Sequence, residues 1–107
     1  MSRDSRTWSL GAADAVTDTL SPSDGFAGIV ALQITGTWVG TITFQATIDG
    51  TNWVSVLAVP SDSTTAATTT TGNGIFRVDA GGYFGIRAKV TAYTSGTAVV
   101  RANNVIG

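Results

Sequence analysis

The sequence predicts an all-β domain, an antiparallel β-sandwich of the Ig-like or jelly-roll kind with about seven or eight short strands. Thr, Val, Ile, Gly and Ala dominate the composition, Glu is absent, and the helix formers Leu, Lys and Gln are scarce. β-Branched side chains fit pleated, half-buried surfaces better than helices. Several segments also alternate apolar and polar residues, and turn-forming residues separate these segments. The 107 residues are enough for one domain.

The first residues of the chain do not follow this pattern. Residues 1–13 are polar and irregular apart from Trp8 and Leu10, so we expect an N-terminal arm followed by a single sandwich domain over residues 14–107. Ordering such an arm costs backbone entropy, so it needs contacts from elsewhere, with Trp8 as an anchor on a neighbouring subunit. The alternative is that Ser5–Leu10 forms an edge strand of its own domain.

The central segment gives the clearest strand and hairpin. Within the strand predicted over Val39–Ile48, residues 41–48 alternate between Thr or Gln at odd positions and apolar residues at even positions, which is typical of a strand with one wet face. Asp49-Gly50-Thr51-Asn52 then predicts a hairpin turn, because Asp-Gly supplies the positive φ that such turns require. An earlier strand is expected over Phe26–Thr35, and a Thr-rich exposed loop over residues 61–71.

The last third of the chain predicts two more alternating strands. They span Tyr83–Tyr93 and Thr97–Ile106, and a tight turn at residues 94–96 separates them. Combined with the central segment, this pattern predicts a core of the following residues: Ile42, Phe44, Ile48, Trp53, Phe76, Phe84, Ile86, Val90 and Val100.

The residues that catalysis and metal binding need are nearly absent. The sequence contains no His and no Cys, so Ser-His and Cys-His nucleophile pairs are excluded, and zinc or iron would lack its usual ligands. The seven acidic residues are all Asp, and most of them fall in the arm or in turns. Asp49 and Asn52 have side chains that could bind calcium, but shaping the turn is the simpler role for both. We therefore expect no enzyme activity and no cofactor.

Charge and hydropathy limit the partners. The formal net charge is −1, which gives no basic field for nucleic acid. No apolar run approaches the about 20 residues of a membrane helix, and none follows the N-terminus as a secretion signal would require. Charged residues make up only 12% of the chain, about half the usual share. We therefore expect partner subunits to cover part of the surface, and the chain to form a dimer or trimer.

Several residues are candidates for partner binding. If residues 94–96 form a tight turn, Lys89 lies opposite Arg101 with Arg87 beside them, and acidic groups of another subunit would relieve this repulsion. Trp38 lies between two glycines and is the best candidate for a surface aromatic, equally suited to protein and to sugar. The full set of predicted contact residues is Arg3, Arg6, Trp8, Leu10, Trp38, Arg87, Lys89 and Arg101.

Three segments resemble a small β-sandwich module of tailed-bacteriophage virions, which occurs in head-decoration, fibre and tail-associated proteins. They are GTWVGTITFQATIDGTNW at residues 36–53, GIFRVDAGGYFGIRA at residues 74–88 and TSGTA at residues 94–98. The resemblance extends from roughly Thr19 to Val100 and provides no catalytic residues to carry over.

The resemblance implies a structural virion protein made in the host cytoplasm. Because the module is nearly the whole chain, it implies a decoration, or cement, protein on the capsid surface, with the major capsid protein or other virion subunits as partners. Two alternatives stay open, a carbohydrate-binding or adhesin-like module and a tail, neck or fibre component.

Overall fold

The computed structural model describes residues 2–17, 19–20, 29–79 and 82–106, with the backbone alone for residues 2–6 and 103–106. All elements in these ranges are strands, and every pairing between named strands is antiparallel, which confirms the predicted all-β antiparallel fold. The sandwich itself stays a prediction, because all seven strands belong to one hydrogen-bonded sheet. The strands are β1 (Ser2–Leu10), β2 (Ile29–Thr47), β3 (Val54–Ser55), β4 (Ala58–Pro60), β5 (Thr69–Thr70), β6 (Gly74–Asp79) and β7 (Gly85–Ile106).

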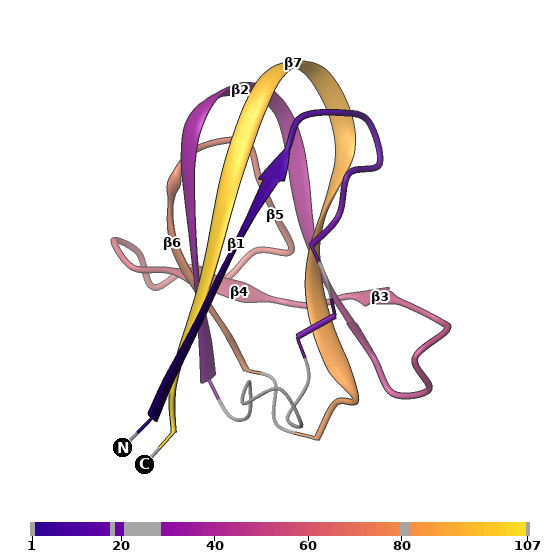
Figure 1. Cartoon of the computed structure of the whole chain (residues 1–107), viewed down its shortest axis with the longest axis vertical. Helices are drawn as coiled ribbons and strands as arrows, with labels where there is room; N and C mark the ends of the chain where they lie inside the picture. The colour runs from indigo at the N-terminus through magenta and orange to yellow at the C-terminus, as the bar shows by residue number, and fades with distance from the viewer. Residues whose placement is uncertain (1, 18, 21–28, 80–81, 107) are drawn as a thin grey trace.

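Two long strands organise the sheet. β2 pairs with β7 from Ala31↔Asn103 to Thr47↔Gly85, and Figure 1 shows both strands bending together in an arch. The predicted turn at residues 94–96 is therefore wrong, because these residues continue β7. The segments predicted as Phe26–Thr35 and Val39–Ile48 are likewise joined in β2; residues 26–28 lie outside the described ranges.

Glycine allows the arch to form at its crest. Gly36 and Gly96 both have positive φ, at 101° and 83°. A Cβ atom on Gly36 would lie 2.6 Å from the carbonyl oxygen of Thr97, and one on Gly96 would collide with the backbone at Thr37. Both positions therefore need a residue without a side chain, since the two strands remain paired while they bend.

The shorter strands extend the two limbs of the arch. In one limb the order is β1-β7-β2-β6-β4, so β1 and β4 are its outer strands. In the other limb β3 and β5 both pair with β2, while Val16 and Leu20 form isolated bridges to β7. Helices long and apolar enough to cross a membrane are absent from the part of the chain that the structure describes.

The core lies between the limbs and is built from the inward positions of both long strands. Phe44 and Phe76 meet there, with ring centroids 5.3 Å apart and planes tilted by 42°. The structure confirms six of the predicted core residues as buried: Ile42, Phe44, Phe76, Ile86, Val90 and Val100.

Three predicted core residues lie elsewhere. Ile48 and Phe84 are exposed, because they lie just beyond the paired ends of β2 and β7, where alternation no longer points into the core. Trp53 is half-buried, and its ring packs against the Arg87 guanidinium.

The N-terminal segment is a strand and not an irregular arm. β1 pairs with β7 along its whole length, from Ser2↔Ile106 to Leu10↔Ala98. Leu10 is buried in the core, and the half-buried Trp8 packs against the core. Both side chains therefore contact their own domain, whereas the arm prediction assigned Trp8 to a neighbouring subunit. Alternation places Trp8 and Leu10 on the same face of β1. The burial of these two side chains offsets the backbone entropy that the segment loses when it becomes ordered. The structure therefore corresponds to the edge-strand alternative.

Candidate functional site

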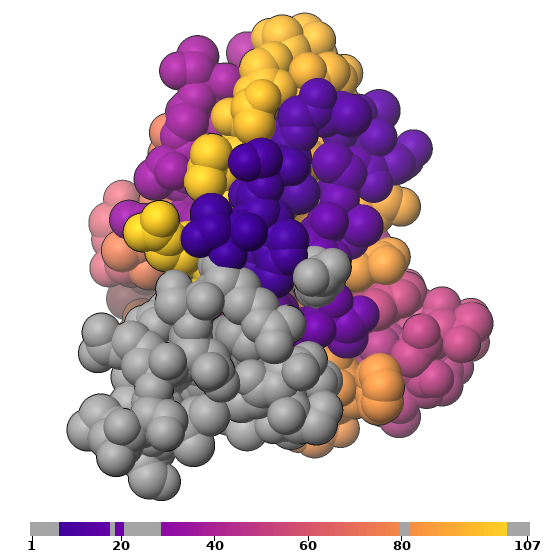
Figure 2. Space-filling model, viewed as in Figure 1, coloured from indigo at the N-terminus to yellow at the C-terminus, as the bar shows by residue number. Residues whose placement is uncertain are grey.

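A groove of about 490 Å³ lies beside the hairpin that joins β2 to β3. The hairpin projects from the body of the protein, and it forms the magenta lobe at the right of Figures 1 and 2. Apolar and small polar side chains line the groove in nearly equal numbers: Ala46, Thr47, Ile48, Asp49, Asn52, Val54, Ser55, Val56 and Tyr83.

Asp49 holds the hairpin turn in one conformation. One carboxylate oxygen accepts hydrogen bonds from the backbone N–H groups of Thr51 and Asn52, both at 2.8 Å. The other oxygen accepts a bond from the Asn52 side-chain amide at 2.7 Å, and the Thr47 hydroxyl donates to Asp49 at 3.1 Å. Gly50 has the positive φ of 80° that the Asp-Gly signature predicts. These bonds hold the groove wall in place.

The same hydrogen bonds keep Asp49 ionised. The backbone N–H groups of Asn52 and then Thr51 favour the charged carboxylate, so the pKa of Asp49 lies well below its ordinary value. Asp49 is therefore a fixed negative charge at the wall of the groove over the whole physiological pH range.

Replacing this carboxylate should destabilise the protein in a pH-dependent way. A group with a depressed folded-state pKa adds stability above its unfolded pKa, and loses it as the pH falls through the folded value. We expect Asp49→Ala to lower the melting temperature at about pH 7, and the difference from the parent to shrink below about pH 4. Thermal melts by circular dichroism across this range test the prediction. The same substitution at the exposed Asp62 is the control, and a difference that does not change with pH would contradict it.

Exposed apolar side chains surround the groove. Ile48 is 76% exposed, Val54 67% and Phe84 55%, which are high values for large apolar residues. The Phe84 ring lies against Gly50, and the Phe84 backbone N–H donates to the Thr47 carbonyl at 2.9 Å. These three residues, here called the apolar rim, therefore lie around one turn. A cluster of this kind on a small protein is typical of a contact surface for another molecule.

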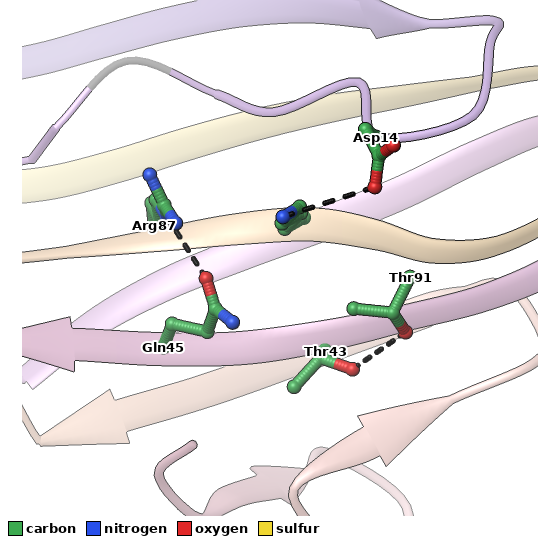
Figure 3. A network of polar contacts seen from close by, with 6 residues as sticks. Asp14, Thr43, Gln45, Arg87 and Thr91 are labelled. Carbon is green, nitrogen blue, oxygen red and sulfur yellow. Dashed lines mark hydrogen bonds and ion pairs between the residues drawn. The ribbon is translucent and has the colours of Figure 1, made fainter. Parts of the chain in front are cut away.

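The basic residues of β7 each have a neighbour of their own. The Arg87 Nε donates to the Gln45 side chain at 2.8 Å, and its guanidinium lies 4.0 Å from the Trp53 ring centroid. The Lys89 ammonium lies 3.8 Å from the Asp14 carboxylate. Figure 3 shows the hydrogen bond between Arg87 and Gln45 and the ion pair made by Asp14.

The predicted pairing of Lys89 with Arg101 is wrong. Lys89 is opposite Thr43, whereas Arg101 lies in the other limb, opposite Gln33 and Thr7. The Arg101 Nε donates to the Thr7 hydroxyl at 3.2 Å. The wrong pairing follows from the turn predicted at residues 94–96. Because β7 is continuous there, Lys89 and Arg101 lie far apart along one strand. Arg87 and Lys89 do share a limb.

The remaining predicted contact residues are dispersed. Trp38 is half-buried at the crest of the arch, and its indole N–H donates to the Asn73 side chain at 2.7 Å. Leu10 is buried and therefore unavailable to a partner. Arg3 and Arg6 lie in β1, opposite Val105 and Ala102; their side chains are outside the described part. The described side chains of the predicted set therefore lie on both limbs and at the crest of the arch, and Leu10 lies in the core.

The apolar rim was not predicted from the sequence. Ile48 and Phe84 were assigned to the core because they continue the alternation of their strands. One signal was available, since each of them directly adjoins a turn, where a strand leaves the core.

Two comparisons found no match: no protein-family model matches this chain, and no curated protein sequence does. Among solved structures, SPBc2 prophage-derived protein YomS superposes with a TM-score of 0.75 at 15% identity, over 96% of this chain and 95% of that one. The PBSX exported protein XepA superposes with a TM-score of 0.76 at 18% identity, over 96% of this chain and 38% of that one. The chain thus has the fold of YomS, and corresponds in length to a little over a third of XepA.

Proposed function

We propose that this protein is a structural, non-enzymatic subunit of a bacteriophage particle, and that its place is on the capsid surface as a decoration protein. The observation that carries the proposal is the fold shared over 96% of the chain with two prophage-derived proteins. The resemblance of residues 36–53 and 74–88 to the virion module leads independently to the same class of protein.

The surface supports a role in binding. The apolar rim of Ile48, Val54 and Phe84 adjoins a groove whose wall is held by the Asp49 hydrogen bonds. A preformed apolar surface binds a partner without an ordering cost, which suits a subunit that attaches to an assembled shell. The major capsid protein or another virion subunit would cover the rim.

The chemistry of the chain supports the same proposal. His, Cys and Glu are absent from the whole sequence, and most described Asp residues lie at turns or loops. The groove contains a single carboxylate, Asp49, and its oxygens already accept hydrogen bonds from the turn. Such a carboxylate stabilises a loop and is poorly placed for proton transfer, which requires a pKa near the working pH.

The copy number in purified particles tests the proposal. We expect quantitative mass spectrometry of particles from the phage or induced prophage that encodes this chain to find copies in proportion to the major capsid protein. Antibody labelling in electron microscopy should mark the head. A few copies located on the tail would mean that the protein is a tail component and not a decoration protein. Absence from particles would overturn the virion assignment. Binding on a glycan array in that last case would support the sugar-binding module.

Variants of the apolar rim sharpen the test. Ile48→Ser and Phe84→Ser should leave the melting temperature close to that of the parent, because both side chains are exposed, and should reduce incorporation into particles. Ile75→Ser is the matched control, since Ile75 is 42% exposed on β6. Equal incorporation of all three variants would exclude the rim as the attachment surface.

A further inference from the structure

Among the described residues, the outer edge of β1 has no pairing strand. β1 is an end strand of nine residues, and no described strand pairs with it on the side away from β7. At the other end of the limb, β4 has three residues and includes Pro60. A long edge strand presents unpaired N–H and C=O groups that can accept another strand, and β1 contains no Pro, which would remove a donor. Its charged residues Arg3, Asp4 and Arg6 oppose every register that places like charges opposite each other.

Symmetry restricts how two copies of β1 can pair. Directly opposed side chains in an antiparallel pair point to the same face of the sheet, and a two-fold axis between the strands preserves that face. One residue of β1 must therefore lie opposite its own copy. Each possible register is named by that central residue.

The charges of β1 select one of these registers. With Arg3, Asp4 or Arg6 at the centre, a charged residue lies opposite its own copy, which is unfavourable. With Ser5 at the centre, Asp4 of each copy lies opposite Arg6 of the other, which gives two oppositely charged pairs. The register also places Arg3 opposite Thr7, so no like charges face each other.

We infer that the protein forms a two-fold symmetric dimer in which the β1 strands of two copies pair antiparallel about Ser5, with Asp4 opposite Arg6 across the interface. This pairing extends one sheet through both protomers and removes the open edge. The inference depends on the strand order and the register, and it stands whether or not the capsid assignment is correct.

Within a protomer, these two charges have uncharged cross-strand neighbours. β7 places Asn104 opposite Asp4 and Ala102 opposite Arg6. The register inside the protomer therefore gives neither residue an opposite charge across β7. Reversing either charge likewise places no like charge opposite it in β7, so repulsion across β7 does not account for a loss of the dimer in these variants.

Sedimentation velocity of the purified full-length chain over a concentration series tests the inference. We expect a monomer–dimer equilibrium in the parent. Asp4→Arg and Arg6→Asp should each weaken the dimer by about tenfold or more, because each change creates two like-charged pairs. The double variant Asp4→Arg/Arg6→Asp should restore the parent affinity, since it exchanges the charges and keeps them complementary.

A matched control separates this effect from net charge. Arg77→Asp changes the net charge by the same amount and in the same direction as Arg6→Asp, on the exposed side of β6, and should leave the dimer unchanged. A parent that is monomeric at every concentration, or that is a trimer, would overturn the inference. So would a dimer that is insensitive to the single reversals, or one that the double variant fails to restore.

Discussion

Phe44→Ala should reduce the free energy of unfolding by about 3–5 kcal/mol, the usual cost of emptying a buried aromatic position. Phe44 is 1% exposed, and its ring packs against Phe76 at a centroid distance of 5.3 Å. Its backbone also joins two other segments, since its N–H donates to the Thr68 carbonyl and its carbonyl accepts from Val56. The cavity left by the Phe44 ring would therefore lie at the position where β2 is bonded to the segments that contain Thr68 and Val56. Urea denaturation followed by fluorescence measures the loss.

Phe84→Ala provides the matched comparison, because it removes the same atoms from a ring that is 55% exposed. This substitution should reduce the free energy of unfolding by less than about 1 kcal/mol, as most surface substitutions do. Similar losses for both variants would mean that the alternation along β2 does not define the core face. A loss for Phe44→Ala below about 1 kcal/mol would mean the same.

The parts of the fold that depend on local pattern could be predicted from the sequence. The alternation through Phe44 identified a strand and its core-facing residues, and Asp49-Gly50 identified the hairpin turn with its positive φ. The wet face predicted for the same strand is wrong, because Thr43 and Thr47 are buried as well. Both signals act within a few residues, so no knowledge of distant pairing is needed. The all-β class follows from the same kind of evidence, because β-branched composition acts residue by residue.

The arch could not be predicted in this way. Thr94-Ser95-Gly96 has the composition of a tight turn, yet Ser95 and Gly96 remain paired with β2 across the crest, and Thr94 is the extra residue of β7 where the register shifts. A glycine with positive φ serves a turn and a sharply bent strand equally well, and the distinction depends on Gly36, which lies far away in the sequence. Because a turn was predicted there, Arg101 was expected opposite Lys89, and the predicted basic patch is not found in the structure.

The candidate site was hidden for a related reason. Ile48 and Phe84 continue the apolar alternation of their strands, and a sequence pattern does not show where the opposite limb ends. Their exposure depends on the lengths of both limbs, which only the paired registers define. β1 was misjudged because its polar residues outnumber Trp8 and Leu10, although these two suffice to attach one strand to β7.

Removing residues 1–10 should therefore cost more stability than any single substitution in the core. The truncation takes away Leu10, which is 3% exposed, together with the Trp8 contact and the whole β1–β7 pairing. It also opens one side of the β7 segment that carries Ala98, Val100 and Ala102, all of them buried. Leu10→Ala alone should cost about 2–5 kcal/mol.

Small domains have only about 5–15 kcal/mol of stability, so the truncated chain should melt far below the full-length protein. Dimer formation through β1 would add stability that depends on protein concentration. Asp4→Arg is therefore the proper reference, because it weakens the dimer and retains every residue of β1 that pairs with β7. Thermal melts of the truncated chain, Leu10→Ala and Asp4→Arg at one low concentration should rank in that order, with the truncated chain least stable. If the truncated chain melts together with Asp4→Arg, β1 contributes nothing to its own domain, and the segment is an arm that serves a neighbouring subunit.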